Sequence, residues 1–417
     1  MQDLRLVKAF AVAFDRECRA IGGLLSVLAL LLVAGCSLLP RLDAPSPESA
    51  DRIPILGIDN ARFFPDRNPG PMVREGVLMA ERQAALAPGG QLGPANFLAL
   101  SGGSDNGAFG AGMMVGWTQS GRRPEFNVVT GVSAGALIAP FAFLGPEYDA
   151  GLREVFTGVS LADIVSLRRL ARGLLFGEGL ADTSPLYNLI SRHANQAMLD
   201  AIGREYGRGR LLLIGTVNLD QQRPVIWNIG AIATSGHPGA LDLFRSILLA
   251  SASIPGAFPP VLLDVEFDGR RYQEMHVDGG AATQVFLYPP SVGLGREARR
   301  RRFERDRTVW VIRNDRIDPE WETISRGVFS ISRRSISTMI HFSGINDIIR
   351  IYGTSRRDRI AFNLAYIDDS FATPRAQPFD PAYMRALFEH GRARAASGMP
   401  WRSAPPGFEE TAVAQGR

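Results

Sequence analysis

The chain has 417 residues, 46% of them hydrophobic and 21% charged, which is enough for one large or two ordinary globular domains. This composition excludes an intrinsically disordered chain, because disorder goes with low hydrophobicity and a high net charge. The formal net charge of +4 is small for this length and gives no reason to predict nucleic-acid binding.

An export signal is predicted at the N-terminus, where basic residues precede an apolar segment that runs from Ile21 to Ala34. The segment is short for a membrane-spanning helix, which needs about 20 apolar residues, but it suits the centre of a signal peptide. It ends in Val33-Ala34-Gly35-Cys36, which resembles the bacterial lipobox. The resemblance implies that residues 1–35 are a lipoprotein signal peptide and that a lipid on Cys36 anchors the protein in the bacterial cell envelope, at the outer membrane or the periplasmic face. A plain N-terminal membrane anchor is the alternative.

The next segment is rich in Pro, Asp and Arg. Residues 37–54 are expected to be a tether, because their Pro and Ser content resists packing. A single helix is predicted over residues 73–87.

From residue 96 onward, short apolar segments alternate with helix-compatible ones. Strands are predicted at 97–100, 126–130, 210–217, 225–228, 274–277 and 308–312, and helices at 108–120, 134–144 and 241–252. This alternation predicts an α/β fold with a mainly parallel sheet flanked by helices. Active sites in such sheets gather beyond the carboxyl ends of the strands, where the glycine-rich segments of this chain are expected.

The first chemical motif is the pentapeptide Gly131-Val132-Ser133-Ala134-Gly135, which matches the G-x-S-x-G nucleophile elbow. A serine on a tight strand-to-helix turn is exposed, and the flanking glycines relieve crowding in the strained backbone. Free N–H groups at the start of the following helix favour a developing oxyanion. The pentapeptide alone is a modest signal, since glycine-rich turns before helices are common.

The second motif is the segment 101–107, Ser-Gly-Gly-Ser-Asp-Asn-Gly, which opens a predicted helix. Consecutive backbone N–H groups in such a loop can hold an anion, either a nucleotide phosphate or the oxyanion of an acyl intermediate. The segment lacks both the G-K-[ST] ending of a P-loop and the G-x-G-x-x-G spacing, which disfavours the phosphate. Gly102, Gly103 and Ser104 are therefore predicted to form an oxyanion hole, with an ordinary tight turn as the alternative.

The third motif is Asp278-Gly279-Gly280, at the end of a short apolar strand. A carboxylate there, within hydrogen-bond reach of Ser133, could accept its proton as general base. An aspartate in an ordinary turn before glycine is the alternative.

Together the three motifs resemble the patatin-like phospholipases, in which a glycine-rich oxyanion loop, a G-x-S-x-G serine and a D-G-[GA] aspartate occur in this order. Other stretches also look like that family: Leu100–Gly103, Gly107–Phe109, Gly131–Leu137, Asp182–Leu186 and Ala250–Pro260. The resemblance covers roughly residues 96–286. It implies a patatin-like α/β fold and a Ser133–Asp278 dyad that hydrolyses acyl esters of phospholipids or related lipids, without histidine, metal or other cofactor. The implied organisation is an N-terminal extension at 36–93, a catalytic domain at 94–290 and a C-terminal extension at 291–417 that packs on it.

The glycine-rich loop departs from the family pattern, because Ser104 replaces the third glycine and Asn106 replaces the usual basic residue. A positive φ would strain Ser104. Asp105 is expected to point to solvent, since a desolvated carboxylate there would oppose catalysis. A cation at position 106 would favour the oxyanion, so Asn106→Arg is predicted to raise turnover unless Asn106 shapes the loop through its own hydrogen bonds.

Two other functions stay open at this point. A Ser-His-Asp triad esterase or lipase would need His341 or His390, because the histidine follows the acid in chain order. A catalytically weak envelope lipoprotein used for binding or assembly would explain the altered loop. Separately, seven arginines between Arg296 and Arg307 indicate a solvated loop or helix face, with contact to anionic lipid headgroups as the alternative.

Overall fold

The computed structural model describes residues 41–165, 182–301, 303–398 and 401–408. The predicted signal peptide and Cys36 lie outside the described residues. In the described part, strands form one sheet in the order β1-β5-β4-β3-β2-β8-β9, and the β6–β7 hairpin is attached to β4. The strands are β1 (Arg62–Phe63), β2 (Ala95–Leu100), β3 (Val128–Val132), β4 (Leu211–Asn218), β5 (Arg223–Asn228), β6 (Val261–Phe267), β7 (Arg270–Asp278), β8 (Arg307–Arg313) and β9 (Ala361–Tyr366).

The centre of the sheet is parallel, as predicted. Strands β4, β3, β2, β8 and β9 pair in parallel, whereas β1, β5 and β7 join the sheet antiparallel. All six predicted strands are present with bounds shifted by a few residues. The α/β class and the mainly parallel, helix-flanked sheet are therefore confirmed.

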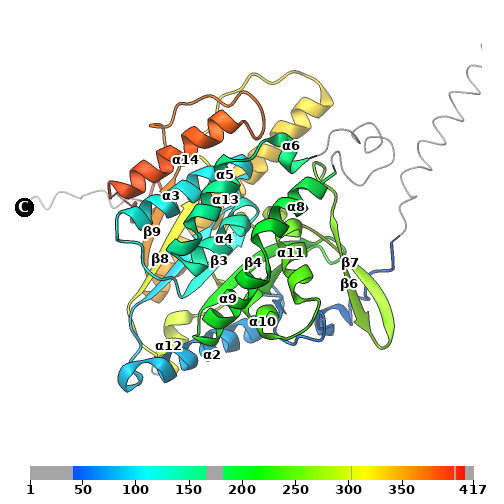
Figure 1. The fold of residues 1–417 in the computed structure, drawn as a ribbon, viewed down its shortest axis with the longest axis vertical. Coiled ribbons are helices and arrows are strands. Elements are labelled where there is room, and N and C mark those ends of the chain that lie inside the picture. The colour runs from blue at the N-terminus through cyan, green and yellow to red at the C-terminus, as the bar shows by residue number, and fades with distance from the viewer. Residues whose placement is uncertain (1–40, 166–181, 302, 399–400, 409–417) are drawn as a thin grey trace, which may run out of the picture.

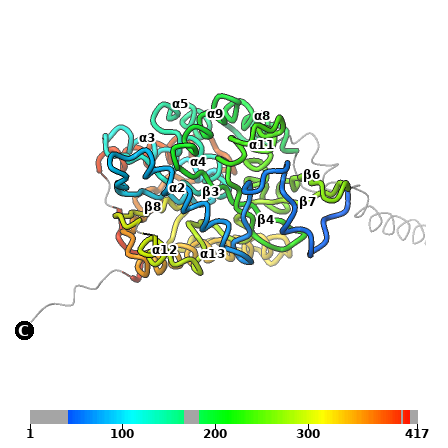
Figure 2. The backbone as a smooth tube through the Cα atoms, turned by 90° about the horizontal axis from the view of Figure 1, so that it is seen from below, coloured from blue at the N-terminus to red at the C-terminus, as the bar shows by residue number. Residues whose placement is uncertain are grey.

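Helices cover both faces of the sheet (Figures 1 and 2). Figure 2 shows α3, α4, α5, α8, α9 and α11 on one side and α12 and α13 on the other. The described helices are α2 (Gly70–Leu86), α3 (Gly107–Gln119), α4 (Ala134–Leu144), α5 (Asp149–Thr157), α6 (Leu161–Ile164), α8 (Ser184–His193), α9 (Gln196–Gly207), α10 (Ile229–Thr234), α11 (Ala240–Ser251), α12 (Leu294–Arg301), α13 (Val328–Asp358) and α14 (Pro381–Ala396).

Two apolar cores lie on the two faces of the sheet. In β2, Leu98 and Leu100 belong to one core, and Phe97 and Ala99 belong to the other. Side chains alternate across a strand, so a strand covered on both faces is apolar at every position. This explains why the central strands appear in the sequence as continuous apolar runs.

The expected tether differs from what the structure shows at residues 41–54. Arg41 donates hydrogen bonds to Asp220 (2.8 Å) and to the backbone oxygen of Gln273 (2.7 Å), and Ile53 is buried in the core. Further along, β1 pairs with β5 at the edge of the sheet. Composition alone did not reveal this packing, because the ion pair and the buried isoleucine involve partners far along the chain.

The expected C-terminal extension, residues 291–417, does not simply pack on a complete catalytic domain. Strand β8 pairs with β2 at the centre of the sheet, and β9 pairs with β8. Helix α14 lies so close to α3 that a Cβ on Gly112 would lie 2.0 Å from the backbone oxygen of Phe388. Residues on both sides of position 290 thus build one sheet and one pair of cores.

Candidate active site

Ser133 lies at the turn between β3 and α4, with a φ of 55°. Positive φ is unfavourable for a residue with a side chain, so this turn stores strain at the serine. The neighbouring glycines permit the close approach of the backbone: a Cβ on Gly131 would lie 2.4 Å from Gly135 O, and one on Gly135 would lie 2.4 Å from Leu100 O. The turn has the geometry of a nucleophile elbow.

The register of β4 brings Ser133 and Asp278 together. Strand β3 ends at Val132, which pairs with Gly215 of β4. Beyond Gly215, the same edge of β4 pairs with β7, where Asp278 lies opposite Thr216. Because β7 runs antiparallel to β4, the ends of β3 and β7 meet head to head. The hydroxyl of Ser133 is hydrogen-bonded to the Asp278 carboxylate.

Asp278 is almost completely buried, and burial raises its pKa from the ordinary value of 3.8 to about 7. The hydrogen bonds from Ser133 and from the N–H of Gly280 (2.7 Å) act in the opposite direction, but burial outweighs them. A carboxylate with a pKa near neutrality is suited to accept and return a proton. At Gly279, a Cβ would lie 2.5 Å from Gly215 O, so only glycine permits this close approach to β4.

The glycine-rich loop lies beside Ser133, and the three N–H groups predicted to form an oxyanion hole differ in their hydrogen bonds. The N–H of Gly102 donates to the backbone oxygen of Gln284 (3.0 Å) and is already used. Among the described residues, the N–H groups of Gly103 and Ser104 donate to no backbone oxygen. Ser104 has a φ of 53°, so the replacement of glycine does strain the loop.

Asp105 does not point to solvent, contrary to the expectation from the sequence. Its side chain is buried, forms an ion pair with Arg375 (3.0 Å) and accepts the N–H of Phe379 (3.0 Å). It does not line the cavity that contains Ser133. The segment before α14 thus neutralises a charge that sequence reasoning had to place in water.

Asn106 is held by its own hydrogen bonds. Its Oδ1 accepts the hydroxyl of Tyr383 (2.6 Å), and its Nδ2 donates to Asp315 (3.5 Å). At the start of α3, a Cβ on Gly107 would lie 2.6 Å from the ring of Phe156. These contacts favour the interpretation in which Asn106 shapes the loop.

We therefore expect Asn106→Arg to lower turnover several-fold. Arginine has no acceptor for the Tyr383 hydroxyl, and its guanidinium would pair with Asp315 rather than with an oxyanion. Steady-state turnover of Asn106→Arg, Asn106→Ala and Tyr383→Phe on one ester should fall by similar factors at similar melting temperatures. An increase in turnover for the arginine variant alone would show that charge at position 106 limits the rate.

Two serines that the sequence did not single out hold the backbone of Ser133 and Asp278. Ser251 is buried, accepts the N–H of Ser133 (3.0 Å) and donates to Gly215 O (2.7 Å). The backbone oxygen of Ser253 accepts the N–H of Asp278 (2.9 Å). Both belong to the stretch Ala250–Pro260, so the family-like sequence there was the available signal. Asn314, which follows β8, also binds the loop by donating from Nδ2 to Ser101 O (2.8 Å).

Ser251→Ala is expected to lower turnover about tenfold, because it leaves the N–H of Ser133 and the oxygen of Gly215 unpaired and frees the elbow to shift. Ser253→Ala is the matched control: its hydroxyl donates only to Leu249 O, and its backbone contact with Asp278 survives. Turnover and thermal melting of both variants check this, and equal losses in the two would contradict the role of Ser251.

Ser133, Asp278 and the glycine-rich loop line one open cavity of about 520 Å³. A second, apolar cavity begins at Ser133 and Ser104 and leads under α4, α5 and α8. A third cavity continues it, sharing the apolar lining residues Leu137, Val155, Leu186 and Leu189. The site therefore combines an open cavity of mixed polar and apolar lining with a narrow apolar passage made of two small cavities, of about 50 and 30 Å³.

All five histidines of the chain lie in the described part, and none lines the cavities at Ser133. His341 lies on α13 and His390 lies on α14, packed against Phe109 and Phe371. His276 is buried between Thr216 (3.1 Å) and Glu274 (3.2 Å). The geometry thus brings no histidine to the serine.

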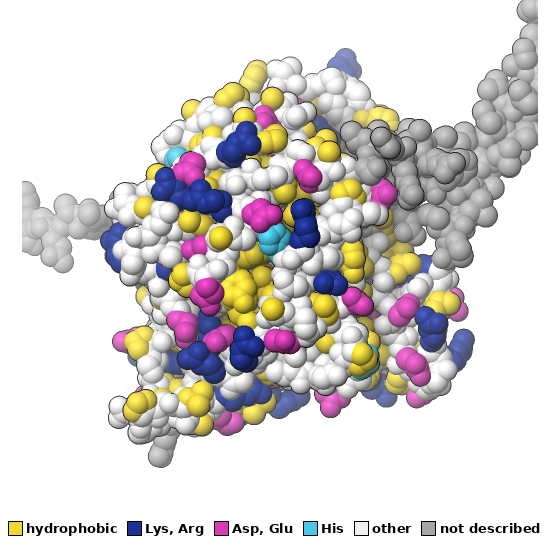
Figure 3. All heavy atoms as spheres, viewed as in Figure 1, with side chains coloured by type: hydrophobic (Ala, Val, Ile, Leu, Met, Phe, Trp, Pro, Cys, Tyr) yellow, Lys and Arg dark blue, Asp and Glu magenta, His cyan; other side chains and the backbone are white. Residues whose placement is uncertain are grey.

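The arginine-rich segment 296–307 lies elsewhere. It includes the end of α12, where Arg300 pairs with Glu297 (2.9 Å), and none of its described residues lines the cavity at Ser133. On the face drawn in Figure 3, basic and acidic side chains are interspersed. The described residues contain no group of three metal-ligating side chains.

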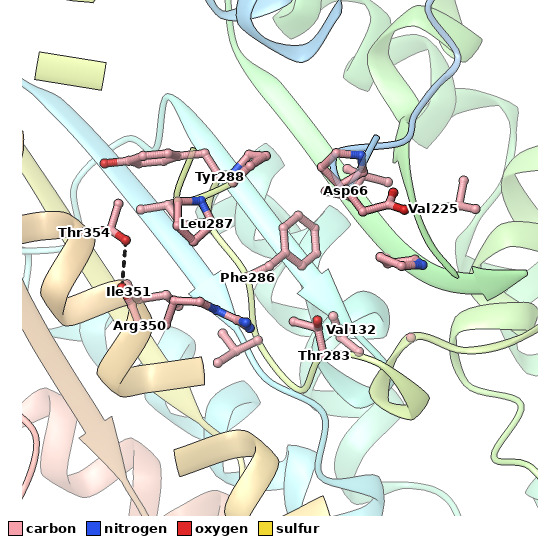
Figure 4. A pocket seen from close by; sticks show the side chains of 18 of the residues that line it. Asp66, Val132, Val225, Thr283, Phe286, Leu287, Tyr288, Arg350, Ile351 and Thr354 are labelled. Atoms are coloured by element: carbon pink, nitrogen blue, oxygen red, sulfur yellow. Dashed lines mark hydrogen bonds between the residues drawn. The ribbon is translucent and has the colours of Figure 1, made fainter. Parts of the chain in front are cut away.

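A separate cavity of about 360 Å³ lies behind the elbow. Figure 4 shows Phe286 pointing into it, between Val132 on one side and Arg350 and Thr354 of α13 on the other. Neither Ser133 nor Asp278 lines this cavity. This cavity therefore contacts residues next to Ser133 and Asp278 but neither of the two themselves.

Comparison with known proteins assigns the central part of the chain. The family model described as patatin-like phospholipase matches residues 98–288, a little under half of the chain. VipD from Legionella pneumophila is similar at 12% identity over 75% of this chain and 69% of VipD, with a TM-score of 0.35. Human GIVD cytosolic phospholipase A2 is similar at 10% identity over 74% of this chain and 52% of its own, with a TM-score of 0.28. No curated protein sequence matches the chain.

Proposed function

We propose that the protein is a serine acyl-hydrolase that cleaves acyl esters of phospholipids or related lipids with a Ser133–Asp278 dyad. One observation carries this proposal: the C-terminal ends of β3 and β7 meet along β4. There the strained Ser133 is hydrogen-bonded to the buried carboxylate of Asp278, whose pKa is raised. The patatin-like domain over residues 98–288 supports the substrate class.

In the first half-reaction, Ser133 Oγ attacks the ester carbonyl while Asp278 accepts its proton. The N–H groups of Gly103 and Ser104 donate to the oxyanion of the tetrahedral intermediate. Asp278 returns the proton to the leaving alcohol, and an acyl-enzyme remains on Ser133. In the second half-reaction, Asp278 takes a proton from water, which attacks the acyl carbon, and the fatty acid leaves as Ser133 is reprotonated.

The apolar passage beside Ser133 fits the acyl chain of such a substrate. Its walls come from α4, α5 and α8, with Leu137, Val155 and Leu189 among them. Burial of the chain is favourable by about 0.8 kcal/mol for each CH₂ group. A lipid with its headgroup in the open cavity and one chain in this passage places its ester near Ser133.

The test is labelling of the purified protein with a fluorophosphonate, together with release of fatty acid from phospholipid. We expect wild type to be labelled and active, and Ser133→Ala to be neither. Absence of label in folded wild type would favour the second candidate, a weakly catalytic envelope lipoprotein, which the strained Ser104 also suggests. Large losses in His341→Ala or His390→Ala, without loss of folding, would favour a triad.

We also propose that Cys36 is lipidated and anchors the protein in the bacterial envelope. The support is the apolar segment that ends in Val33-Ala34-Gly35-Cys36. Intact-mass measurement of the membrane fraction should show an acylated Cys36 as first residue, and Cys36→Ala should release the protein or mislocalise it. An unmodified Cys36 in wild type would refute the anchor.

A further inference from the structure

The first half of α13 and the loop before it expose an unusual number of large apolar side chains. Trp321 and Phe329 are 90% and 92% exposed. We define the α13 apolar surface as Trp321, Val328, Phe329, Ile331, Ile336 and Met339, all of them exposed. Soluble proteins rarely leave apolar side chains gathered in this way, unless the surface meets a partner or a membrane.

The exposure is confined to one half of the helix. From Gly344 onward α13 is packed on the sheet, with Ile348 and Ile351 in one of the two cores. Gly344 itself leaves room for the guanidinium of Arg313, since a Cβ there would overlap it. In Figure 1 the yellow N-terminal part of α13 reaches the upper edge of the molecule. A well-anchored second half thus holds the apolar first half in place.

The α13 apolar surface continues into the active-site cavity. Ile336 and Met339 line the same cavity as Ser133 and Asp278. A lipid that moves along this helix therefore reaches the cavity of the serine over the apolar side chains of Ile336 and Met339. No such continuity is needed for a surface that only binds another protein.

The helical part of this surface is basic, whereas Glu320 and Glu322 flank Trp321 in the loop before it. Residues 323–346 contain Arg326, Arg333 and Arg334 but no Asp or Glu. Glu322 in the preceding loop pairs with Arg333 (2.5 Å) and Arg334 (3.5 Å). Exposed ion pairs of this kind contribute only about 0–1 kcal/mol, so lipid phosphates can replace the glutamate.

We propose that the α13 apolar surface docks on an anionic phospholipid bilayer, with Trp321 and Phe329 at the boundary between headgroups and acyl chains. The first half of α13 then lies in the plane of the interface, as amphipathic helices with aromatic and basic residues do. In the part of the chain that the structure describes, no helix has the length and apolar character of a membrane span. The proposal rests on the proposed function, because it supplies phospholipid to Ser133. A second copy of the chain on this surface would instead cover the entrance to the cavity.

Trp321 is the reporter for the test. The other tryptophans, Trp117, Trp227, Trp310 and Trp401, are buried or half-buried. The full chain with Cys36→Ala, which carries no lipid, is mixed with phosphatidylglycerol–phosphatidylethanolamine vesicles. We expect the emission to shift to the blue and to be quenched by brominated acyl chains, and the Trp321→Ser protein to lose both changes.

The matched pair of variants is Phe329→Ser and Leu86→Ser. Leu86 is 64% exposed at the end of α2, and Figure 1 shows α2 at the lower edge of the molecule, opposite the first half of α13. Burial of one phenylalanine is worth about 1.5–3 kcal/mol, so Phe329→Ser should weaken vesicle binding and vesicle hydrolysis about tenfold or more. Hydrolysis of a soluble short-chain ester should stay within about twofold of wild type in both variants.

The outcomes separate this proposal from the proposed function. Quenching of Trp321 in a protein that hydrolyses neither substrate would refute the acyl-hydrolase and support docking. Hydrolysis of the soluble ester without any quenching of Trp321 would overturn docking and keep the enzyme. A blue-shifted Trp321 in a dimer that forms without vesicles, and that Phe329→Ser dissociates, would overturn docking in favour of self-association.

Discussion

Asp278→Asn is expected to lower hydrolysis of an ester about 10²–10⁴-fold in a protein that still folds. Asparagine has nearly the shape of aspartate and keeps an oxygen that can accept the N–H of Gly280, but it cannot take the proton of Ser133. The measurement is steady-state turnover on a short-chain ester, with circular dichroism and thermal melting to verify the fold.

The control for this prediction is the double variant Ser133→Ala/Asp278→Asn. Residues that act as one unit in a mechanism are strongly non-additive, so the double variant should be about as inactive as either single variant. Additive losses would mean that the two side chains act independently. Retention of more than about half of the activity in folded Asp278→Asn would refute the assignment of Asp278 as base.

The nearness of Ser133 and Asp278 could be predicted because the sequence signals of the two motifs are local. A serine between two glycines and an aspartate before two glycines each record a close backbone approach, which Gly131, Gly135 and Gly279 permit in the structure. Each motif also follows an apolar strand, which predicts where along the sheet it lies. The head-to-head meeting of β3 and β7 could not be predicted, because it depends on the register of β4.

The surroundings of the site escaped prediction because they depend on distant partners. Asp105 is neutralised by Arg375, which lies 270 positions further along the chain. The N–H of Gly102 is taken by Gln284, and the elbow is held by Ser251. None of these contacts leaves a periodic pattern in the sequence. They are set by tertiary packing, which composition and spacing do not encode locally.

Helix α13 shows the same limit in the fold. Its first half mixes exposed apolar residues with serines, Arg333 and Arg334, so the sequence there contains no continuous apolar run to draw attention to it. In its second half, apolar residues such as Ile348 and Ile351 pack on the sheet. The segment that sequence reasoning passed over is thus the one for which we propose a role at the lipid interface.

The burial of Asp278 should make activity and stability respond to pH in opposite directions. The raised pKa, about 7, means that the carboxylate is the minor form below neutrality. Since only the carboxylate can act as base, kcat/KM should fall about tenfold for each pH unit below 7 and level off above about 8. The charged side chains of Arg313 and Asp315 line the same cavity as Asp278. Both are still present in Asp278→Asn, so their effects on the pH profile are common to the variant and wild type.

The effect on stability has the opposite sign. Because the pKa of Asp278 is higher in the folded protein than the ordinary value of 3.8, the folded state binds the proton more tightly than the unfolded state does. This contribution favours folding at low pH and is lost as pH rises from about 4 through 7. The loss is on the order of a few kcal/mol at pH 8, and asparagine does not incur it.

Asp278→Asn should therefore melt higher than wild type by a margin that grows between pH 5 and pH 8. Thermal melting of the two proteins across this range measures the margin, and other titrating groups cancel in the difference. A margin that stays constant with pH, or a rate that is flat from pH 5 to 8, would show that Asp278 is ionised throughout and that its burial does not set its chemistry.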